Sequence, residues 1–582
     1  MNIKKILLKK FILSLNKNNI NIPSFIDIKL SKQNKFGDYQ INSAISISKK
    51  LKISSMECAK KIVNTLDLKS IAYKIEIINP GFINIFLNKK WIEKKINISM
   101  KSKRFGIKIV KIPQNIIIDY SSPNAVKSMH VGHMRSTIIG DAIVKVLEFL
   151  GHKVIRANHI GDWGSQFGMI LAYLFEKKKL KKNINNIIKK FIPNLEKLYI
   201  SAKKKYIKDI DFVKKSKKYF LKLQNNDKEC LNIWKKLISI TINQNKKIYK
   251  RLNVSLTNND IKGESFYKKL LPNIVSDLKL KKLAIEKNGS TIVVIDSLKN
   301  KIGKDMGVII QKKDKTYLYI TIDIACLKYR CEILKADRII YYVDSRQNQH
   351  LNLSWKIARI AGYVSKSVLL EHHMFGMMLN KNKIPFKTRD GNVITLLSLL
   401  NEASERAYNF LSKKNIKINN KKLKYISEIV GIGTIKYSDL SKNRITNYIF
   451  DWNKILSFDG NTALYMQYAY ARINSILKKS KLKKNNLINK IFLSSQEEIN
   501  LAIKILQYEE VIYSMAKDGM PHFLCNYLYE TSVIFSSFYE NCPILNIKNK
   551  YLKLSRLSLS FLTSRILKHG LNILGIKTVK KI

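Results

Sequence analysis

The stretch NIIIDYSSPNAVKSMHVGHMRSTIIGD, residues 115–141, decides the fold expected for this chain. Its first six residues form an almost unbroken apolar, β-branched run, which is typical of a parallel strand covered on both faces. Turn formers at 121–124 end the run, and apolar residues then recur at helical spacing from Met129 to Val146. The pattern predicts a strand that leads directly into a helix.

The tetrad HVGH, residues 130–133, falls at the predicted start of this helix. Unpaired backbone N–H groups and the positive end of the helix dipole attract anions there. Gly132 has no side chain, so a phosphate or an adenine ring can approach the backbone closely. His130 and His133 share one helical face, where both can donate to phosphoryl oxygens whose charge grows during displacement at phosphorus. The pair alone leaves open a capping or core role.

Composition bounds the class of protein. A chain of 582 residues is expected to divide into three or four units. Lys and Arg number 107 against 42 Asp and Glu, a formal charge of +65, which favours a polyanionic partner. A genome rich in A and T, which loads proteins with Lys, Ile and Asn, is an alternative source of part of this surplus.

The cysteine spacing and the length of the apolar runs argue against a zinc-binding, disulfide-linked, secreted or membrane-spanning protein. The six cysteines contain no C-x-x-C pair, which argues against a zinc site and against a disulfide framework, so we expect no protein-bound metal. The N-terminal segment lacks a small-residue cleavage site, and no apolar run approaches the ~18 residues of a membrane span. A cytoplasmic protein without a membrane partner is the expectation.

The first unit, residues 1–112, is predicted to be α+β, with a strand at 77–88 and a basic linker at its end. Within it FGDYQ places Phe36 and Gln40 where an unpaired RNA base could stack and form hydrogen bonds. A turn with core aromatics explains the same segment from the residues alone.

The middle unit begins with the strand at Asn115, and residues 152–168 supply a second strand after the first helix. A β-α-β order implies a right-handed crossover and a doubly wound parallel sheet, with ligands at the carboxyl ends of its strands. Residues 177–250 are lysine-rich and amphipathic, which predicts a helical insertion without catalytic clusters. Residues 290–296 and 306–313 alternate as strands do.

Two later segments, 316–330 and 339–353, are each predicted to run from a strand into a helix and carry polar groups there. A guanidinium substrate would need a carboxylate for its fork of N–H donors, plus a tyrosine and neutral acceptors to orient it. Asp323 is the candidate carboxylate and Tyr319 the tyrosine. Asp323 could instead be a helix N-cap.

The last unit, from about Asp459 to Ile582, has the apolar spacing of an antiparallel helical bundle. One of its helices is rich in aromatic and polar residues, and Tyr465, Tyr468 and Arg472 could present stacking faces to splayed bases. Aromatics at helical spacing are also common in cores, so both interpretations stay open on composition.

The motif SSPN-x-x-K-x-M-H-V-G-H-x-R-S-T-I-I-G-D resembles the signature of class I aminoacyl-tRNA synthetases in the form carried by arginyl-tRNA synthetases. The resemblance implies an α/β protein: a class I Rossmann-type doubly wound catalytic domain at 113–458, an N-terminal α+β tRNA-binding domain at 1–112 and a C-terminal all-α anticodon-binding bundle at 459–582. The signature residues are Pro123, Asn124, Ala125, Val126, Lys127, Ser128, Met129, His130, Val131, Gly132 and His133.

The resemblance also implies roles for single residues. Asn124 would hold the amino or carboxylate end of arginine, Tyr319 and Asp323 its guanidinium, and Gln347 and Glu264 further polar contacts. The catalytic groups would be His130, His133 and Lys127, and ATP would contact Gly132, both histidines and the basic residues Lys387 and Arg389. The RNA contacts would come from Phe36, Gln40, Tyr465, Tyr468 and Arg472.

The segment PFKTRDG, residues 385–391, stands where class I synthetases usually have K-M-S-K. Arginyl enzymes commonly depart in this way, and in them a lysine upstream of the histidine tetrad, here Lys127, takes over part of the loop's role. Lys387 and Arg389 still suit a mobile phosphate clamp. A merely solvated basic loop is the alternative.

The implied reaction joins arginine to tRNA(Arg) through an arginyl-adenylate, with ATP as substrate and Mg²⁺ on its phosphates. The family also implies a monomer that needs tRNA even for the first step. Two other classes stay open: a small-molecule adenylyltransferase, which would not need the C-terminal helical unit, and a non-enzymatic RNA-binding protein, which would not need Asp323.

Overall fold

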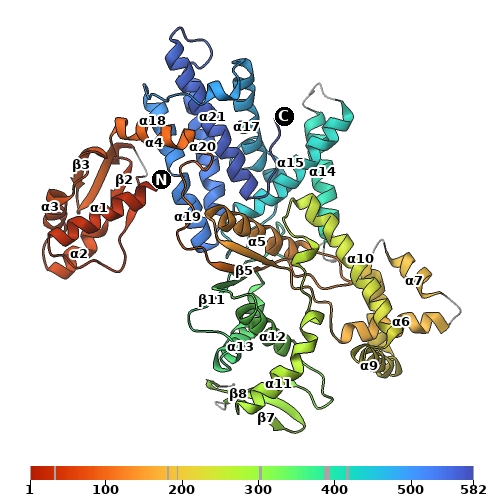
Figure 1. The fold of residues 1–582 in the computed structure, drawn as a ribbon. Coiled ribbons are helices and arrows are strands. Elements are labelled where there is room, and N and C mark those ends of the chain that lie inside the picture. Colours follow the sequence, from red (N-terminus) through yellow and green to blue (C-terminus); the bar gives the residue numbers. More distant parts are fainter. Residues whose placement is uncertain are drawn as a thin grey trace.

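The computed structural model describes residues 2–31, 34–179, 183–192, 195–299, 305–385, 394–413 and 419–580. Figure 1 shows an N-terminal α+β unit (red to orange) on one side and a helical bundle (blue) above a central α/β unit. A group of inserted helices (yellow) lies on the opposite side. Helix α5 (Val131–Leu150) lies near the centre, where these parts meet.

The central sheet contains four parallel strands in the order β11-β10-β5-β6. They span Leu369–His372, Arg338–Tyr341, Asn115–Asp119 and Lys153–Ala157, respectively. From β5 the chain continues to β6 on one side, whereas β10 and β11 lie on the other side. The order therefore reverses between β5 and β10, and in open α/β sheets ligands bind in the crevice at the carboxyl ends of the strands at such a switch point. The expected doubly wound sheet is confirmed.

Both faces of β5 are covered, as its apolar run predicts. Ile116 and Ile118 belong to a core shared with α5 and the C-terminal helices. Ile117 belongs to a core shared with α11 (Leu271–Leu280), α12 (Tyr319–Glu332) and α13 (Asn348–Ile360). Successive side chains of a strand point to opposite faces, so one short strand anchors both layers. Each isoleucine is fully buried, which stabilises the fold by ~1.5–3 kcal/mol per side chain.

Helix α5 has clear boundaries. His130 is its N-cap, and Gly151 follows its last residue in the left-handed region at φ 96°, donating to the carbonyl oxygens of Leu147 and Glu148. A Cβ atom at Gly140 would lie 2.5 Å from Cβ of Tyr120, at the end of β5. The glycine therefore permits close contact between the helix and the strand that precedes it.

A group of helices follows β6 in the chain. They are α6 Ser165–Lys179, α7 Ile184–Phe191, α8 Leu195–Lys208, α9 Ile210–Gln224 and α10 Lys228–Leu252. The first of these helices begins before residue 177, where the insertion was expected to start. An antiparallel sheet follows, made of β7 Ala284–Lys287, β8 Ser290–Lys299 and β9 Asp305–Gln311. The other elements of this part of the chain are η2 Asn258–Asp260, η3 Glu264–Leu270, α11 Leu271–Leu280, α12 Tyr319–Glu332, η4 Ser345–Gln347 and α13 Asn348–Ile360.

The prediction of a strand at the start of residues 316–330 is wrong. Tyr317 forms only an isolated bridge to Gln311, and α12 begins at Tyr319. A turn held by Asp314, whose carboxylate accepts from the Thr316 backbone, ends the hairpin before a further strand can form. The β-branched residues Ile320, Ile322 and Ile324 instead pack α12 against the central sheet. Tertiary packing therefore overrides the local strand propensity of this segment.

The N-terminal unit packs directly on the bundle. Its sheet, in the order β1-β2-β4-β3, contains Ile28–Leu30, Tyr39–Ile41, Phe82–Leu87 and Ala72–Ile78; its helical elements are α1 Ile3–Lys17, η1 Asn34–Phe36, α2 Ser43–Leu51, α3 Ser55–Thr65 and α4 Lys89–Lys101. Tyr39 is fully buried and donates to Glu510 of α19 over 3.0 Å. Asn97 of α4 exchanges two hydrogen bonds with the backbone of Ile491. These contacts join the two ends of the chain.

The remaining elements are mostly helical. They are β12 Met378–Leu379, α14 Leu396–Ser412, α15 Asn420–Leu440, β13 Tyr448–Ile449, α16 Trp452–Ile455, α17 Ala463–Lys479, η5 Lys484–Leu487, α18 Gln496–Leu506, α19 Tyr508–Asp518, α20 His522–Asn541 and α21 Lys550–Ile573. The expected helical bundle at the end of the chain is therefore confirmed. Among the described residues, no helix combines the length and apolar character that a membrane crossing needs.

Candidate active site

The loop between β5 and α5 is held in a strained conformation. Ser121, Ser122 and Val126 have φ values of 70°, 43° and 61°, in the left-handed region that a β-branched valine rarely adopts. Side chains from other elements hold it: Asn158 accepts from the Ser122 backbone at 3.1 Å, and Thr241 accepts from that of Val126 at 3.2 Å. Such conformations cost ~1–3 kcal/mol each and are often found at functional sites.

The two histidines of the tetrad fix each other's orientation. The Gly132 backbone N–H donates to His130 Nδ1, and the His130 backbone N–H donates to His133 Nδ1, both over 3.1 Å. Because each Nδ1 accepts a hydrogen bond, the proton of each neutral ring lies on Nε2. The ring centroids are 3.9 Å apart. The pair therefore serves as the helix cap and still offers two Nε2–H donors, so the capping and catalytic interpretations are compatible.

Electrostatics keep both rings neutral. Burial, and then the charges of His130 and Lys127, lower the pKa of His133 to about 3. Burial also lowers the pKa of His130; Glu196 opposes this effect, whereas Arg346 and Lys127 strengthen it. Neutral imidazoles at neutral pH are hydrogen-bond donors to phosphoryl oxygens and do not need to lose a proton during the reaction.

Gly132 is required by the cap itself. A Cβ atom at this position would lie 2.9 Å from Cε1 of His130. Any side chain would push the His130 ring out of its hydrogen bond with the Gly132 backbone. The glycine thus maintains the histidine pair, in addition to the open approach expected from the sequence.

Two cations lie close to His130. Lys127 places its Nζ 4.6 Å from the ring centroid of Tyr199, in the inserted helix α8. Arg346, in the segment after β10, is 83% exposed and forms a bidentate ion pair with Asp344 at 2.8 and 3.0 Å. Both charges lower the pKa of His130. The tetrad therefore lies near one cation from the segment after β5 and one from the segment after β10.

Asp323 lies in the second turn of α12, whose N-cap is Leu318, so its alternative role as an N-cap is excluded. His350 Nε2 donates to Asp323 Oδ2 over 2.5 Å, and this hydrogen bond raises the pKa of His350. The Asp323 side chain is 30% exposed. Tyr319, one turn earlier, reaches Gly164 after β6, where a Cβ atom would lie 2.9 Å from its hydroxyl oxygen.

Glu264, the first residue of η3, completes an acidic group beside Asp323. Its Oε2 atom is buried and accepts no hydrogen bond from any residue that the structure describes. Burial raises the pKa of its carboxyl to about 8, and the nearby charges of Asp162 and Asp323 contribute to this increase. The charge of His159 opposes this increase, but Oε2 still lacks a hydrogen-bond donor, so a ligand with N–H donors would satisfy it.

The other predicted contacts are dispersed around this crevice. Asn124 is exposed and forms a bridge with Gly161, where a Cβ atom would lie 2.3 Å from Asn124 Oδ1. Gln347 is exposed at the end of η4, between β10 and α13. Lys387 and Arg389 lie outside the described residues.

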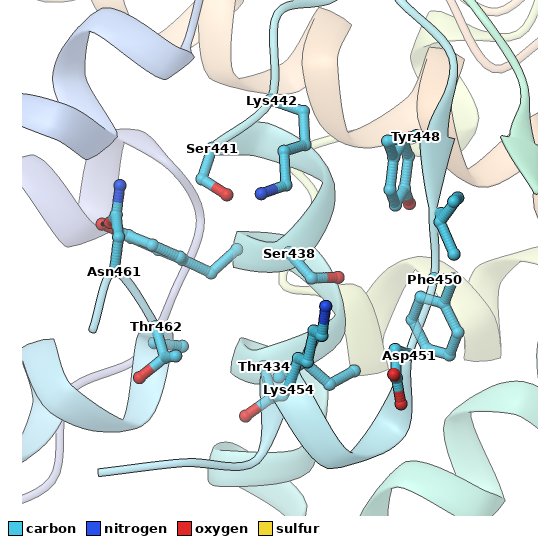
Figure 2. A pocket seen from close by; sticks show the side chains of 14 residues that line it. Thr434, Ser438, Ser441, Lys442, Tyr448, Phe450, Asp451, Lys454, Asn461 and Thr462 are labelled. Atoms are coloured by element: carbon cyan, nitrogen blue, oxygen red, sulfur yellow. Dashed lines mark hydrogen bonds between the residues drawn. The ribbon is translucent and has the colours of Figure 1, made fainter. Parts of the chain in front are cut away.

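A small cavity lies at the junction with the bundle, between the end of α15 and the start of α17. Figure 2 shows Ser438, Lys442, Tyr448, Asp451 and Asn461 among its lining side chains. Its volume is about 110 Å³, well below the about 300–1,000 Å³ of a pocket for a drug-sized ligand. This cavity is therefore too small to replace the switch-point crevice as the nucleotide site.

A groove of about 1070 Å³ lies between α15, α17 and α21. Six basic side chains and no carboxylate line it: Lys422, Arg472, Lys478, Arg565, Lys568 and Lys580. Tyr468, 40% exposed, also lines the groove. Tyr465 instead packs against Tyr529, with ring centroids 5.7 Å apart. The groove has the charge and the exposed aromatic ring expected of a nucleic-acid surface.

The N-terminal candidates lie on and beside a short turn. Phe36 ends η1 and is half-buried, with Lys35 Nζ 5.0 Å from its ring centroid. The amide of Gln40 donates to Asn84 over 2.8 Å, so part of its hydrogen-bonding capacity is used within the sheet.

Sequence patterns did not single out Tyr199 or Thr241. Both belong to the insertion, more than 70 residues after Lys127 along the chain. Only a three-dimensional structure brings Tyr199 to Lys127 and Thr241 to Val126.

Family models match almost the whole chain. The catalytic domain of tRNA synthetases class I (R) matches residues 96–452, the DALR anticodon binding domain 466–582, and the arginyl tRNA synthetase N terminal domain 2–87. Together with the parallel sheet and the histidine-capped helix at its switch point, these matches define a class I aminoacyl-tRNA synthetase.

Individual relatives are more specific. The chain is 55% identical over 581 residues to the arginine–tRNA ligase of Buchnera aphidicola subsp. Schizaphis graminum (strain Sg), and 54% identical over 588 residues to that of Blochmanniella pennsylvanica (strain BPEN). Both matches cover 100% of each chain. The solved arginyl-tRNA synthetase of Plasmodium falciparum superimposes with a TM-score of 0.85 at 31% identity, covering 100% of this chain and 99% of that one. This chain belongs to the arginyl-tRNA synthetases.

Proposed function

We propose that the switch-point crevice activates L-arginine with ATP and transfers it to the terminal adenosine of tRNA(Arg), releasing AMP and pyrophosphate. One observation carries the assignment of the arginine pocket: Glu264 Oε2 is buried near Asp323 and accepts no hydrogen bond from any described residue, and the charge of His159 offsets only part of the burial that raises the pKa of this carboxyl. A guanidinium supplies a delocalised positive charge and a planar fork of N–H donors, which suits two adjacent carboxylates.

In this proposal Asp323 and Glu264 bind the guanidinium, and Tyr319 and Gln347 orient it. Asn124, on the β5 side of the crevice, holds the amino or carboxylate end of arginine. The arginine carboxylate then points toward a phosphate bound at the start of α5. Catalysis then consists mainly of positioning the attacking oxygen.

The Nε2–H groups of His130 and His133 and the ammonium of Lys127 stabilise charge on the phosphoryl oxygens. The carboxylate oxygen of arginine attacks the α-phosphorus, the bond to pyrophosphate breaks, and the adenylate forms. In the second step a ribose hydroxyl of the terminal adenosine attacks the acyl carbon and AMP leaves. Lys387 and Arg389 are proposed to neutralise the departing pyrophosphate.

RNA contacts are proposed at both ends of the chain: Phe36 and Gln40 in the N-terminal unit, and Tyr465, Tyr468 and Arg472 in the bundle. The basic lining of the α15–α17–α21 groove supports this for Tyr468 and Arg472. The division at residues 112/113 and 458/459 into tRNA-binding, catalytic and anticodon-binding domains remains part of the proposal.

We propose that Mg²⁺ enters with ATP. The signature region offers imidazole and ammonium donors to the phosphates, so the ligands of the ion would be phosphate oxygens and water. A monomer in the cytoplasm is the proposed working form.

The decisive assay is aminoacylation of bulk tRNA with each of the twenty labelled amino acids, in which only arginine should be incorporated. Asp323→Asn should abolish charging and leave tRNA affinity unchanged. Stable charging with a neutral amino acid would refute the pocket assignment. ATP–pyrophosphate exchange at full rate without tRNA would refute the expected tRNA requirement.

A further inference from the structure

The helical insertion packs against the signature loop. Ala125 and Val126 of that loop belong to one apolar cluster with Leu195 and Leu198 of α8. Ala125 and Val126 are both buried against the insertion, so the insertion holds the backbone that leads into the next residue, Lys127.

The insertion also fixes the backbone immediately before Lys127. Val126 has φ 61° and is fully buried, and its N–H donates to Thr241 Oγ1 of α10 over 3.2 Å. The Thr241 hydroxyl donates in turn to the Leu237 carbonyl over 2.9 Å. Loss of this acceptor would leave a buried N–H without a partner in a conformation that is already strained.

The side chain of Lys127 is held by the same insertion. Its Nζ lies 4.6 Å from the centre of the half-buried Tyr199 ring. Glu196 lies three residues earlier on α8, on the same helical face, and its charge acts on His130. Burial, and then the nearby Glu264 and Tyr199, raise the pKa of Tyr319. This face of α8 therefore extends from the phosphate side of the crevice to the arginine side.

We propose that Tyr199 is a positioning residue for Lys127: its ring holds the ammonium beside the His130–His133 pair, where the phosphates of ATP are expected. This inference rests on the proposed role of Lys127. A lysine side chain is flexible, with ~2 kcal/mol of rotamer entropy, and an aromatic face restrains it electrostatically. The contact leaves ammonium N–H groups available for phosphate oxygens, since Lys has three donors.

A double-mutant cycle tests the inference. The variants are Tyr199→Ala, Tyr199→Phe, Lys127→Ala and the double variant Tyr199→Ala/Lys127→Ala, assayed by ATP–pyrophosphate exchange with saturating tRNA and arginine. Loss of an exposed cation–π contact corresponds to ~0.5–1 kcal/mol, so Tyr199→Ala should lower kcat/KM for ATP about two- to fivefold. Tyr199→Phe keeps the ring and should match the wild type.

The cycle separates positioning from a structural role. If Tyr199 acts through Lys127, Tyr199→Ala should have no additional effect in the Lys127→Ala background. Tyr206→Ala is the matched control, because Tyr206 packs on the same cluster seven residues along α8, about 10 Å away along the helix axis. It should leave kcat/KM for ATP unchanged at a similar melting temperature.

Each other outcome is informative. An equal loss from Tyr199→Ala in both backgrounds, or no loss while Lys127→Ala is impaired, overturns the inference and leaves the proposed function intact. Unchanged ATP kinetics in Lys127→Ala would instead refute the proposed role of Lys127, and the inference with it.

Discussion

The affinity for arginine should rise with pH because of Glu264. The pKa of this carboxyl is raised to about 8 by burial and by the charges of Asp162 and Asp323. A guanidinium pairs with the ionised form, so arginine binding lowers this pKa and releases a proton. Between the ordinary pKa of 4.5 and about 8, each increase in pH makes the ionised pocket easier to form.

The magnitude follows from the ionised fraction. At pH 7 a carboxyl with a pKa of about 8 is ionised in about one molecule in eleven, and its deprotonation costs about 1.4 kcal/mol. At pH 8.5 about three molecules in four are ionised. The arginine Kd should therefore fall about tenfold from pH 6 to pH 7, about eightfold more by pH 8.5, and then level off.

Calorimetric titration of the wild type and Glu264→Gln from pH 6 to pH 9 measures this. Glutamine has almost the same shape as a protonated glutamate but cannot ionise, so the Kd values of the two proteins should lie closest near pH 6 and diverge as pH rises. The ratio of their Kd values removes the titration of arginine itself and of His350. Parallel curves for the two proteins would show that Glu264 does not titrate on binding, which would refute its place in the pocket.

Three further predictions concern other parts of the molecule. His130→Asn should slow adenylation by ~10² or more in single-turnover assays, because it removes the Nε2–H donor and keeps a good N-cap. An unchanged rate of adenylation together with a lower melting temperature would indicate a capping role only. Arg330→Met would leave Asp119 buried without its 2.5 Å ion pair, so the free energy of unfolding in urea should fall by ~3–5 kcal/mol, and an unchanged midpoint would contradict the buried pair. Phe36→Ala and Tyr468→Ala should raise the KM for tRNA in aminoacylation and leave pyrophosphate exchange unchanged at saturating tRNA; unaltered KM values would exclude both as RNA contacts.

The sequence by itself determined the strand β5, the helix α5 and the position of the HVGH tetrad between them. The β-branched run at 115–120 and the helical spacing after Met129 predicted β5 and α5, because both elements are specified by local periodicity. The tetrad was placed at the helix start for the same reason. Its neutral, Nδ1-bonded state could not be predicted, since this depends on backbone hydrogen bonds and burial.

Only the tertiary structure decided how distant segments share the site. Asp323 was expected at the end of a strand but lies in the second turn of α12, because the preceding hairpin closes at Asp314. The insertion looked like a lysine-rich helical region without catalytic features, yet α8 brings Tyr199 to Lys127 and α10 brings Thr241 to Val126. Contacts between residues far apart in the chain leave no periodic signal in either segment, so local patterns specify the elements and packing specifies the site.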